Sequence, residues 1–123
     1  NTQLIKEGLP LAKRYRNQSV AEQNSVDVAW EMLMEPAYAN LRACIYTSPS
    51  ELERFRQLLV NAVMATDIMD KDLKTLRNNR WDVAFDTSRE QTSRDAVNRK
   101  ATIVIEHLIQ ASDVSHTMQH WHM

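Results

Sequence analysis

One acidic residue, Asp113, closes a nearly all-apolar stretch of the chain and is the residue best suited to chemistry. Ile105, Ile109 and Asp113 are spaced four residues apart, so on an α-helix they share one face. An ionised carboxylate that faces a core is costly unless a cation, a metal or several hydrogen-bond donors meet it. The sequence therefore predicts that Asp113 is buried and has such a partner.

Spacing alone leaves two interpretations of Asp113 open. It precedes Val-Ser-His at an expected helix break, where aspartate is a favoured N-cap of the following helix, and caps are far commoner than metal sites. Alternatively, Asp113 shares a metal with His116 and His120, because two histidines four residues apart on a helix are a known ligand pair. That pair lacks the further ligands that zinc usually requires, so spacing alone favours the cap.

Three other residues could take part in chemistry, and each has a simpler structural explanation. Thr66 ends an amphipathic helix, where its hydroxyl either bonds back to the preceding turn or points at a bound water. Glu22 follows Ser19 by three residues, and this capping-box spacing explains it without any function. Cys44 has no histidine or basic cluster nearby in sequence, so we expect a core thiol rather than a nucleophile.

The composition excludes several classes of protein. The 123 residues are enough for one domain or part of a larger one, and their net charge of -1 argues against a nucleic-acid partner. The single cysteine excludes an intramolecular disulfide and favours a reducing, cytoplasmic compartment. No apolar run in this chain approaches the ~18 residues that span a membrane, which leaves a tether outside this segment open. No glycine-rich phosphate loop is present, which excludes P-loop or Rossmann nucleotide binding.

The turn-forming residues are those of an all-α protein. The chain has one glycine and three prolines, fewer than a sheet protein needs for its turns. Gly8 is expected to end one helix, and Pro10 to begin the next. Pro36 is expected to separate a helix ending near Met34 from a short helix ending near Cys44.

The second half of the chain predicts three longer helices. Residues 48–51 form a second capping box, with proline at the first helical position, before an amphipathic segment. Asp70 can cap a helix that runs to about Phe85. A polar loop over residues 86–94 then leads to an apolar helix over residues 96–112. The expected fold is a compact all-α bundle of about seven helices.

Two short motifs resemble the catalytic domain of class I cyclic-nucleotide phosphodiesterases. They are Val-Met-Ala-Thr-Asp-Ile at residues 63–68 and Ile-Gln-Ala-Ser-Asp-Val-Ser-His at residues 109–116. Residues 1–5 look like the segment just after that family's histidine–aspartate metal motif, and residues 19–22 match a glutamate at a helix start. The resemblance covers essentially the whole chain. It implies that residues 1–123 are part of a phosphodiesterase catalytic domain, truncated at both ends.

The resemblance also implies a reaction, hydrolysis of the 3′,5′-cyclic phosphate of cAMP and/or cGMP in signal transduction. The family holds two divalent metals, usually zinc with magnesium or manganese; a bridging hydroxide attacks the phosphate, and a histidine protonates the leaving 3′ oxygen. Paired metals generate such a nucleophile and neutralise the phosphoryl oxygens. The general-acid histidine and the early metal ligands would precede Asn1, and the purine-clamping glutamine would follow Met123. We therefore predict that the isolated 123 residues are inactive and bind no stoichiometric zinc.

Residue by residue, Asp113 matches the family's late aspartate, which is a direct metal ligand. Thr66 matches a threonine that bonds metal-bound water, and Glu22 matches a glutamate that acts behind the ligands. The position of His116 is occupied by histidine in the family's calmodulin-stimulated, dual-specificity branch, whereas cAMP-specific members often have asparagine there. We therefore expect dual or relaxed selectivity. Three residues match positions near the nucleotide: Ile68, Val114 and His116.

The chain departs from the family pattern in two places. Gln23, Asn24 and Ser25 follow Glu22 where the family often has asparagine and two histidines, and Thr117 replaces a common proline. These departures leave open a second hypothesis, a degenerate member that binds nucleotide or protein without hydrolysis. A third hypothesis is an unrelated helical interaction domain in which the late aspartate is only a cap.

Overall fold

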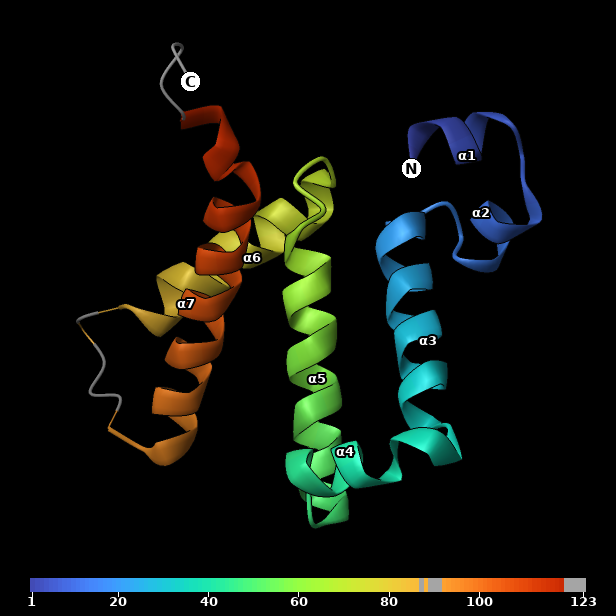
Figure 1. The fold of residues 1–123 in the computed structure, drawn as a ribbon. Coiled ribbons are helices and arrows are strands. Elements are labelled where there is room, and N and C mark those ends of the chain that lie inside the picture. The colour runs from blue at the N-terminus through green and yellow to red at the C-terminus, as the bar shows by residue number, and fades with distance from the viewer. Residues whose placement is uncertain (87, 89–91, 119–123) are drawn as a thin grey trace. The chain divides into compact units, whose positions relative to one another are not determined.

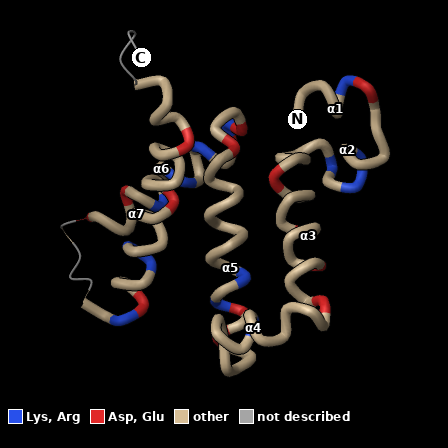
Figure 2. Tube along the Cα trace, viewed as in Figure 1, with Lys and Arg blue, Asp and Glu red and all other residues tan. Residues whose placement is uncertain are grey.

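The computed structural model describes residues 1–86, 88 and 92–118. These residues form seven α-helices, two short 3₁₀ helices and no strand (Figure 1), which confirms the predicted all-α fold. The chain divides into two units, residues 1–64 and residues 65–123. Every helix in the described part is too short or too polar to cross a bilayer. Acidic and basic residues are interspersed along the helices of each unit (Figure 2), in keeping with the near-neutral net charge.

The first unit is built from short helices with proline at their starts. Gly8 connects the first two helices with a φ of 61°, a left-handed conformation that glycine adopts without a Cβ clash. Pro10 and Pro36 each occupy the first helical position, where the missing N–H is not needed. The predicted boundaries are therefore confirmed to within two residues. The helices are α1 (Thr2–Lys6), α2 (Pro10–Arg14), α3 (Val20–Met34), η1 (Pro36–Tyr38), α4 (Ala39–Ile45) and α5 (Pro49–Ala65), whose last residue belongs to the second unit.

The start of α3 differs from the predicted capping box. Ser19 is the N-cap residue, but its φ is 38°, and its buried Oγ has no hydrogen-bond partner within the described chain. An N-cap serine normally has an extended backbone, from which its oxygen reaches the first free N–H groups of the helix. In this structure the side chain of Asn1 takes the place of the serine oxygen. Asn1 Oδ1 accepts from Ala21 N, and Asn1 Nδ2 donates to Glu22 Oε2, both at 2.7 Å. The reciprocal serine–glutamate box was a wrong prediction.

A small core joins the first three helices. The phenol of Tyr15 donates to Asp27 Oδ2 at 2.7 Å, which ties α2 to α3. That hydrogen bond to a carboxylate raises the pKa of Tyr15 above its ordinary value of 10.0. The core residues and the side chains packed on them are Ala12, Tyr15, Val20, Leu4, Ile5 and Leu11.

The capping box at the start of α5 is confirmed. Glu51 Oε2 accepts from Thr47 N at 2.7 Å, from Thr47 Oγ1 at 2.8 Å and from Ser48 N at 3.2 Å. Ser48 Oγ in turn accepts from Glu51 N at 3.3 Å. The bonds from Thr47, with those from Ser48, lower the pKa of Glu51 below its ordinary value of 4.5.

Acid is expected to loosen this first turn of α5. Because the folded state lowers the pKa of Glu51, its stabilisation is complete above the unfolded value of 4.5 and is lost as pH falls through the lower folded value. Amide hydrogen exchange at residues 50–53, followed between about pH 3 and pH 6, measures this loss. Glu51→Gln should flatten the pH dependence, whereas Glu53→Gln, at an exposed glutamate, should keep it. Equal profiles for both variants would contradict the assignment.

The second unit contains two long helices and a final 3₁₀ turn. Asp70 caps α6 as predicted, since its Oδ1 accepts from Asp72 N at 2.9 Å and from Leu73 N at 3.0 Å. Ser93 caps α7 by accepting from Ala96 N at 3.2 Å. The predicted polar loop lies between these helices and includes residues 87 and 89–91, which are outside the described residues. The elements are α6 (Lys71–Ala84), α7 (Arg94–Val114) and η2 (Ser115–Met118).

Helices α6 and α7 contact each other through apolar, charged and aromatic side chains. Ile103 of α7 is 1% exposed and is the largest fully buried side chain of this unit. Glu106, one turn later, is 3% exposed and accepts from Arg80 Nη1 at 3.1 and 3.2 Å through its two oxygens. Trp81 extends the contact, with its ring 4.6 Å from that of His107. The buried face of α7 is thus set by residues three to four positions apart.

Candidate functional site

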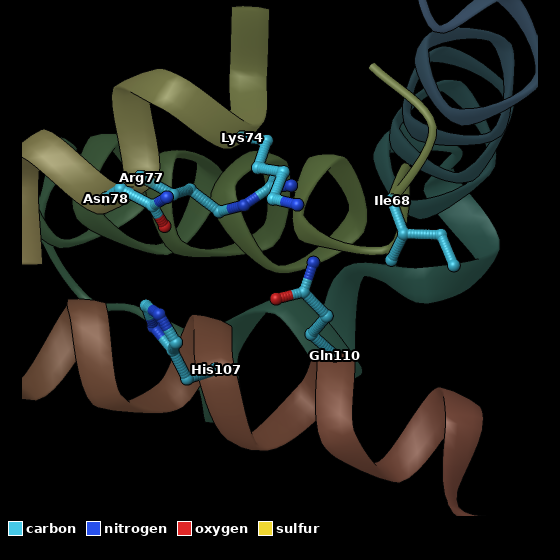
Figure 3. Close-up of a pocket in the computed structure, with 6 residues that line it drawn as sticks. All are labelled: Ile68, Lys74, Arg77, Asn78, His107 and Gln110. Carbon is cyan, nitrogen blue, oxygen red and sulfur yellow. The ribbon is translucent and has the colours of Figure 1, made fainter. Parts of the chain in front are cut away.

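The second unit contains a polar pocket of about 300 Å³ between α6, α7 and the connection before α6. Figure 3 shows the side chains of α6 facing those of α7 across the pocket, with Ile68 at one side. Both helices contribute nitrogen-bearing side chains, and none of the described lining residues is acidic. The lining residues are Ile68, Lys74, Arg77, Asn78, His107 and Gln110.

Helical spacing brings these side chains together. Lys74, Arg77 and Asn78 are three or four residues apart on α6, so they share one face, and His107 and Gln110 share a face of α7 for the same reason. The sequence alone does not reveal this group, because neither set is a metal or catalytic motif by itself. The signal that could have found them is the repeat of polar nitrogen-bearing residues at helical spacing, on two helices that pack together.

The connection between α5 and α6 is fastened to both helices of the unit. Asp67 is 6% exposed, and its Oδ1 accepts from the backbone N–H groups of residues 69 and 70, both at 3.2 Å. Arg77 Nη2 donates to Asp67 O at 3.4 Å, and Gln110 Nε2 donates to Ala65 O at 3.3 Å. These bonds hold the segment that carries Thr66 against the pocket.

Two predicted site residues lie in this connection. Thr66 is half-buried, and its carbonyl accepts from Ile68 N at 2.9 Å. Ile68 is 45% exposed and lines the pocket. The roles predicted for them, bonding a metal-bound water and contacting the nucleotide, stay predictions.

The burial predicted for Asp113 is wrong for this chain, because Asp113 is exposed. The stripe on which the prediction rested is not the core face either, since Ile105 is 37% exposed while Ile103 and Glu106 are buried. Asp113 follows the buried Glu106 by seven residues, which is about two helical turns. However, α7 has 21 residues and α6 has 14, so the last turns of α7 lie beyond the contact between the two helices (Figure 1). Burial therefore does not support a metal role for Asp113, and that role rests on the family pattern.

The capping interpretation of Asp113 is also wrong. Asp113 lies inside α7, which continues to Val114 and has Ser115 as its C-cap residue. The Asp113 carbonyl oxygen lies 3.1 Å from Nδ1 of the exposed His116 ring. His120, the other histidine of the proposed pair, lies outside the described residues. Val114 is half-buried, and its carbonyl accepts from Thr117 Oγ1 at 2.7 Å.

Two remaining candidates belong to the first unit. Glu22 is half-buried on α3 and accepts from Asn1, as described above, whereas the other predicted site residues belong to the second unit. Cys44 is exposed on α4, so the expectation of a core thiol was wrong.

Comparison with known proteins decides the family. A family model described as 3′5′-cyclic nucleotide phosphodiesterase matches residues 1–123, the whole chain. The chain belongs to this family. No curated protein and no solved structure gives a significant match. The membership removes the third hypothesis, an unrelated helical domain, and confirms the resemblance carried by residues 63–68 and 109–116.

Members of this phosphodiesterase family are generally metal-dependent, so the side chains present must be able to hold a metal if the chain carries such a site. Within the described residues, no three histidine, cysteine, aspartate or glutamate side chains are grouped so that they could hold a metal ion. A catalytic zinc normally takes three protein ligands and an open position. The described residues therefore do not fit a two-metal site by themselves, and Asp113 could supply one ligand of such a site at most.

Proposed function

We propose that this chain is part of the catalytic domain of an enzyme that hydrolyses the 3′,5′-cyclic phosphate of cAMP and/or cGMP. The single observation that supports the proposal most strongly is the phosphodiesterase family match over residues 1–123. The chain has histidine at position 116, as the dual-specificity branch does, and this supports relaxed selectivity between the two nucleotides. The single cysteine supports a cytoplasmic location.

The proposed enzyme needs metal ligands in addition to those that the described residues supply. The described chain offers no group of three metal-binding side chains, so most ligands for zinc and for magnesium or manganese must come from elsewhere. Within this chain we assign Asp113 as one metal ligand and Thr66 and Glu22 as residues that orient the site. The hydrogen bond from Gln110 to Ala65 supports pairing Thr66 with Asp113, because it joins their two segments.

Hydrolysis assays on two lengths of protein test this proposal. The purified 123 residues, supplied with zinc and magnesium, are expected to turn over neither cAMP nor cGMP and to retain no stoichiometric zinc. A longer protein that includes the flanking segments is expected to hydrolyse at least one of them. Turnover by the 123 residues alone would contradict the partial-domain assignment. A longer protein that binds cyclic nucleotide without hydrolysis would instead support the degenerate alternative, which the substitutions at residues 23–25 suggest.

Thr66→Val in the longer protein is expected to lower kcat about 10- to 100-fold with little change in folding. The substitution removes a hydroxyl but keeps the shape of the side chain. Thr75→Val is the matched control, because Thr75 is exposed on α6 and its Oγ1 donates to the Lys71 carbonyl of its own helix, at 3.0 Å. A Thr66→Val protein that unfolds without any specific loss of turnover would mean that Thr66 is structural.

A further inference from the structure

Arg77 is a buried cation without a carboxylate partner in the described chain. Its side chain is among the buried charged groups, at 7% exposed, and its hydrogen bond is one N–H to the neutral Asp67 carbonyl at 3.4 Å. Burying a charge is costly unless an opposite charge or several hydrogen bonds compensate it. Arg80, one turn later, shows the usual solution, since Glu106 accepts from it at 3.1 Å. The Arg77 side chain lines the pocket described above (Figure 3).

The other side chains of the pocket add to this positive charge. Lys74 contributes an ammonium group, and Asn78 and Gln110 contribute neutral amides. One N–H of Gln110 Nε2 is already used by the Ala65 carbonyl, which leaves the other. His107 completes the α7 side of the pocket. The nearest buried acids are engaged elsewhere: Glu106 binds Arg80, and Asp67 accepts two backbone N–H groups through Oδ1. The pocket therefore presents donors and positive charge, with no acidic side chain among its described lining residues.

We propose that this pocket binds the phosphate group of a small ligand. The planar fork of Arg77 matches two oxygens of a phosphate, and Lys74 adds a second charge-assisted bond. A volume of about 300 Å³ is at the small end of ligand sites, so it suits inorganic phosphate or a nucleoside 5′-monophosphate. Ile68 lines this pocket and is also predicted to contact the nucleotide in hydrolysis. The proposal does not depend on the proposed hydrolysis, because Lys74 and Arg77, which would bind the phosphate, are not assigned to it.

Titration of the 123-residue chain in EDTA tests the ligand class. The probes are inorganic phosphate, adenosine 5′-monophosphate, adenosine and acetate, and the signals are the side-chain amides of Asn78 and Gln110 in NMR spectra. Phosphate and the monophosphate are expected to bind at least about tenfold more tightly than adenosine or acetate. Tighter binding of the monophosphate than of phosphate would identify a nucleotide ligand, and equal binding would identify free phosphate. No saturable binding of either, or equal binding of acetate, would overturn the proposal.

Variants of α6 test the binding residues. Arg77→Gln and Lys74→Gln are each expected to weaken phosphate binding about tenfold. Lys71→Gln removes the same charge from the first turn of α6, outside the pocket lining, and is expected to stay within about twofold. If circular dichroism shows that the Arg77→Gln protein is unfolded, the Lys74→Gln protein still tests the site, because Lys74 is exposed. Equal losses in Lys74→Gln and Lys71→Gln would overturn the site, and neither result would affect the hydrolysis assay, which needs metal.

Discussion

Asp113→Asn is expected to lower cyclic-nucleotide hydrolysis by the longer protein about a thousandfold. A metal contributes several kcal/mol of charge stabilisation, and each 1.36 kcal/mol is tenfold in rate, so loss of a charged ligand has an effect of about this size. Asparagine keeps the shape but not the negative charge that a hard divalent ion prefers. Steady-state turnover and bound metal, measured on the same preparation, should fall together.

The exposure of Asp113 allows the loss of a metal ligand to be distinguished from a loss of folding. Because the side chain is exposed in this chain, the substitution should change the free energy of unfolding of the 123 residues by no more than about 0.5 kcal/mol. Asp95→Asn, at an exposed aspartate in the first turn of the same helix, is the control and should keep full turnover. Full metal content and turnover in the Asp113 variant would remove it from the proposed site.

Ile103→Ala is expected to have the largest effect on folding, about 3 to 4 kcal/mol of unfolding free energy. Ile103 is 1% exposed, so its truncation leaves a cavity where α7 meets α6. A loss of this size is a large part of the roughly 5–15 kcal/mol that stabilises a small domain. Urea unfolding of the 123-residue chain, followed by circular dichroism, measures it.

The matched control for Ile103 lies five residues later on the same helix. Leu108 is 61% exposed, so Leu108→Ala should cost less than about 1 kcal/mol. If the two alanine variants unfold at the same urea concentration, the buried face of α7 has been wrongly assigned.

The helices could be predicted because their ends are determined by nearby residues. Asp70 accepts from N–H groups two and three residues ahead, and Glu51 closes a box with residues 47–48. The start of α3 shows where such local rules end. The serine and glutamate there have the right spacing, but the left-handed backbone of Ser19 and the distant side chain of Asn1 determine the actual cap.

The candidate site was less predictable, because burial and pockets depend on which helices meet. Periodicity along α7 correctly indicated an apolar helix, but it could not show that α6 covers Ile103 and leaves Asp113 exposed. The same limit hid the pocket, since Arg77 and Gln110 lie 33 positions apart and only the packing of their helices brings them to one cavity. Family resemblance supplied the roles of Thr66 and Asp113, which no local rule contains.

The contact between Trp81 and His107 gives the second unit an intrinsic optical reporter. The imidazole lies 4.6 Å from the indole and also lines the cavity between α6 and α7. Indole emission is sensitive to a neighbouring imidazole, so any molecule that displaces this ring would alter the fluorescence of Trp81. Trp30, paired with Phe55 in the first unit, and Trp121 would also emit, so replacing both would leave Trp81 as the reporter. Binding in the cavity could thus be followed by tryptophan fluorescence, without an added label and without catalytic turnover.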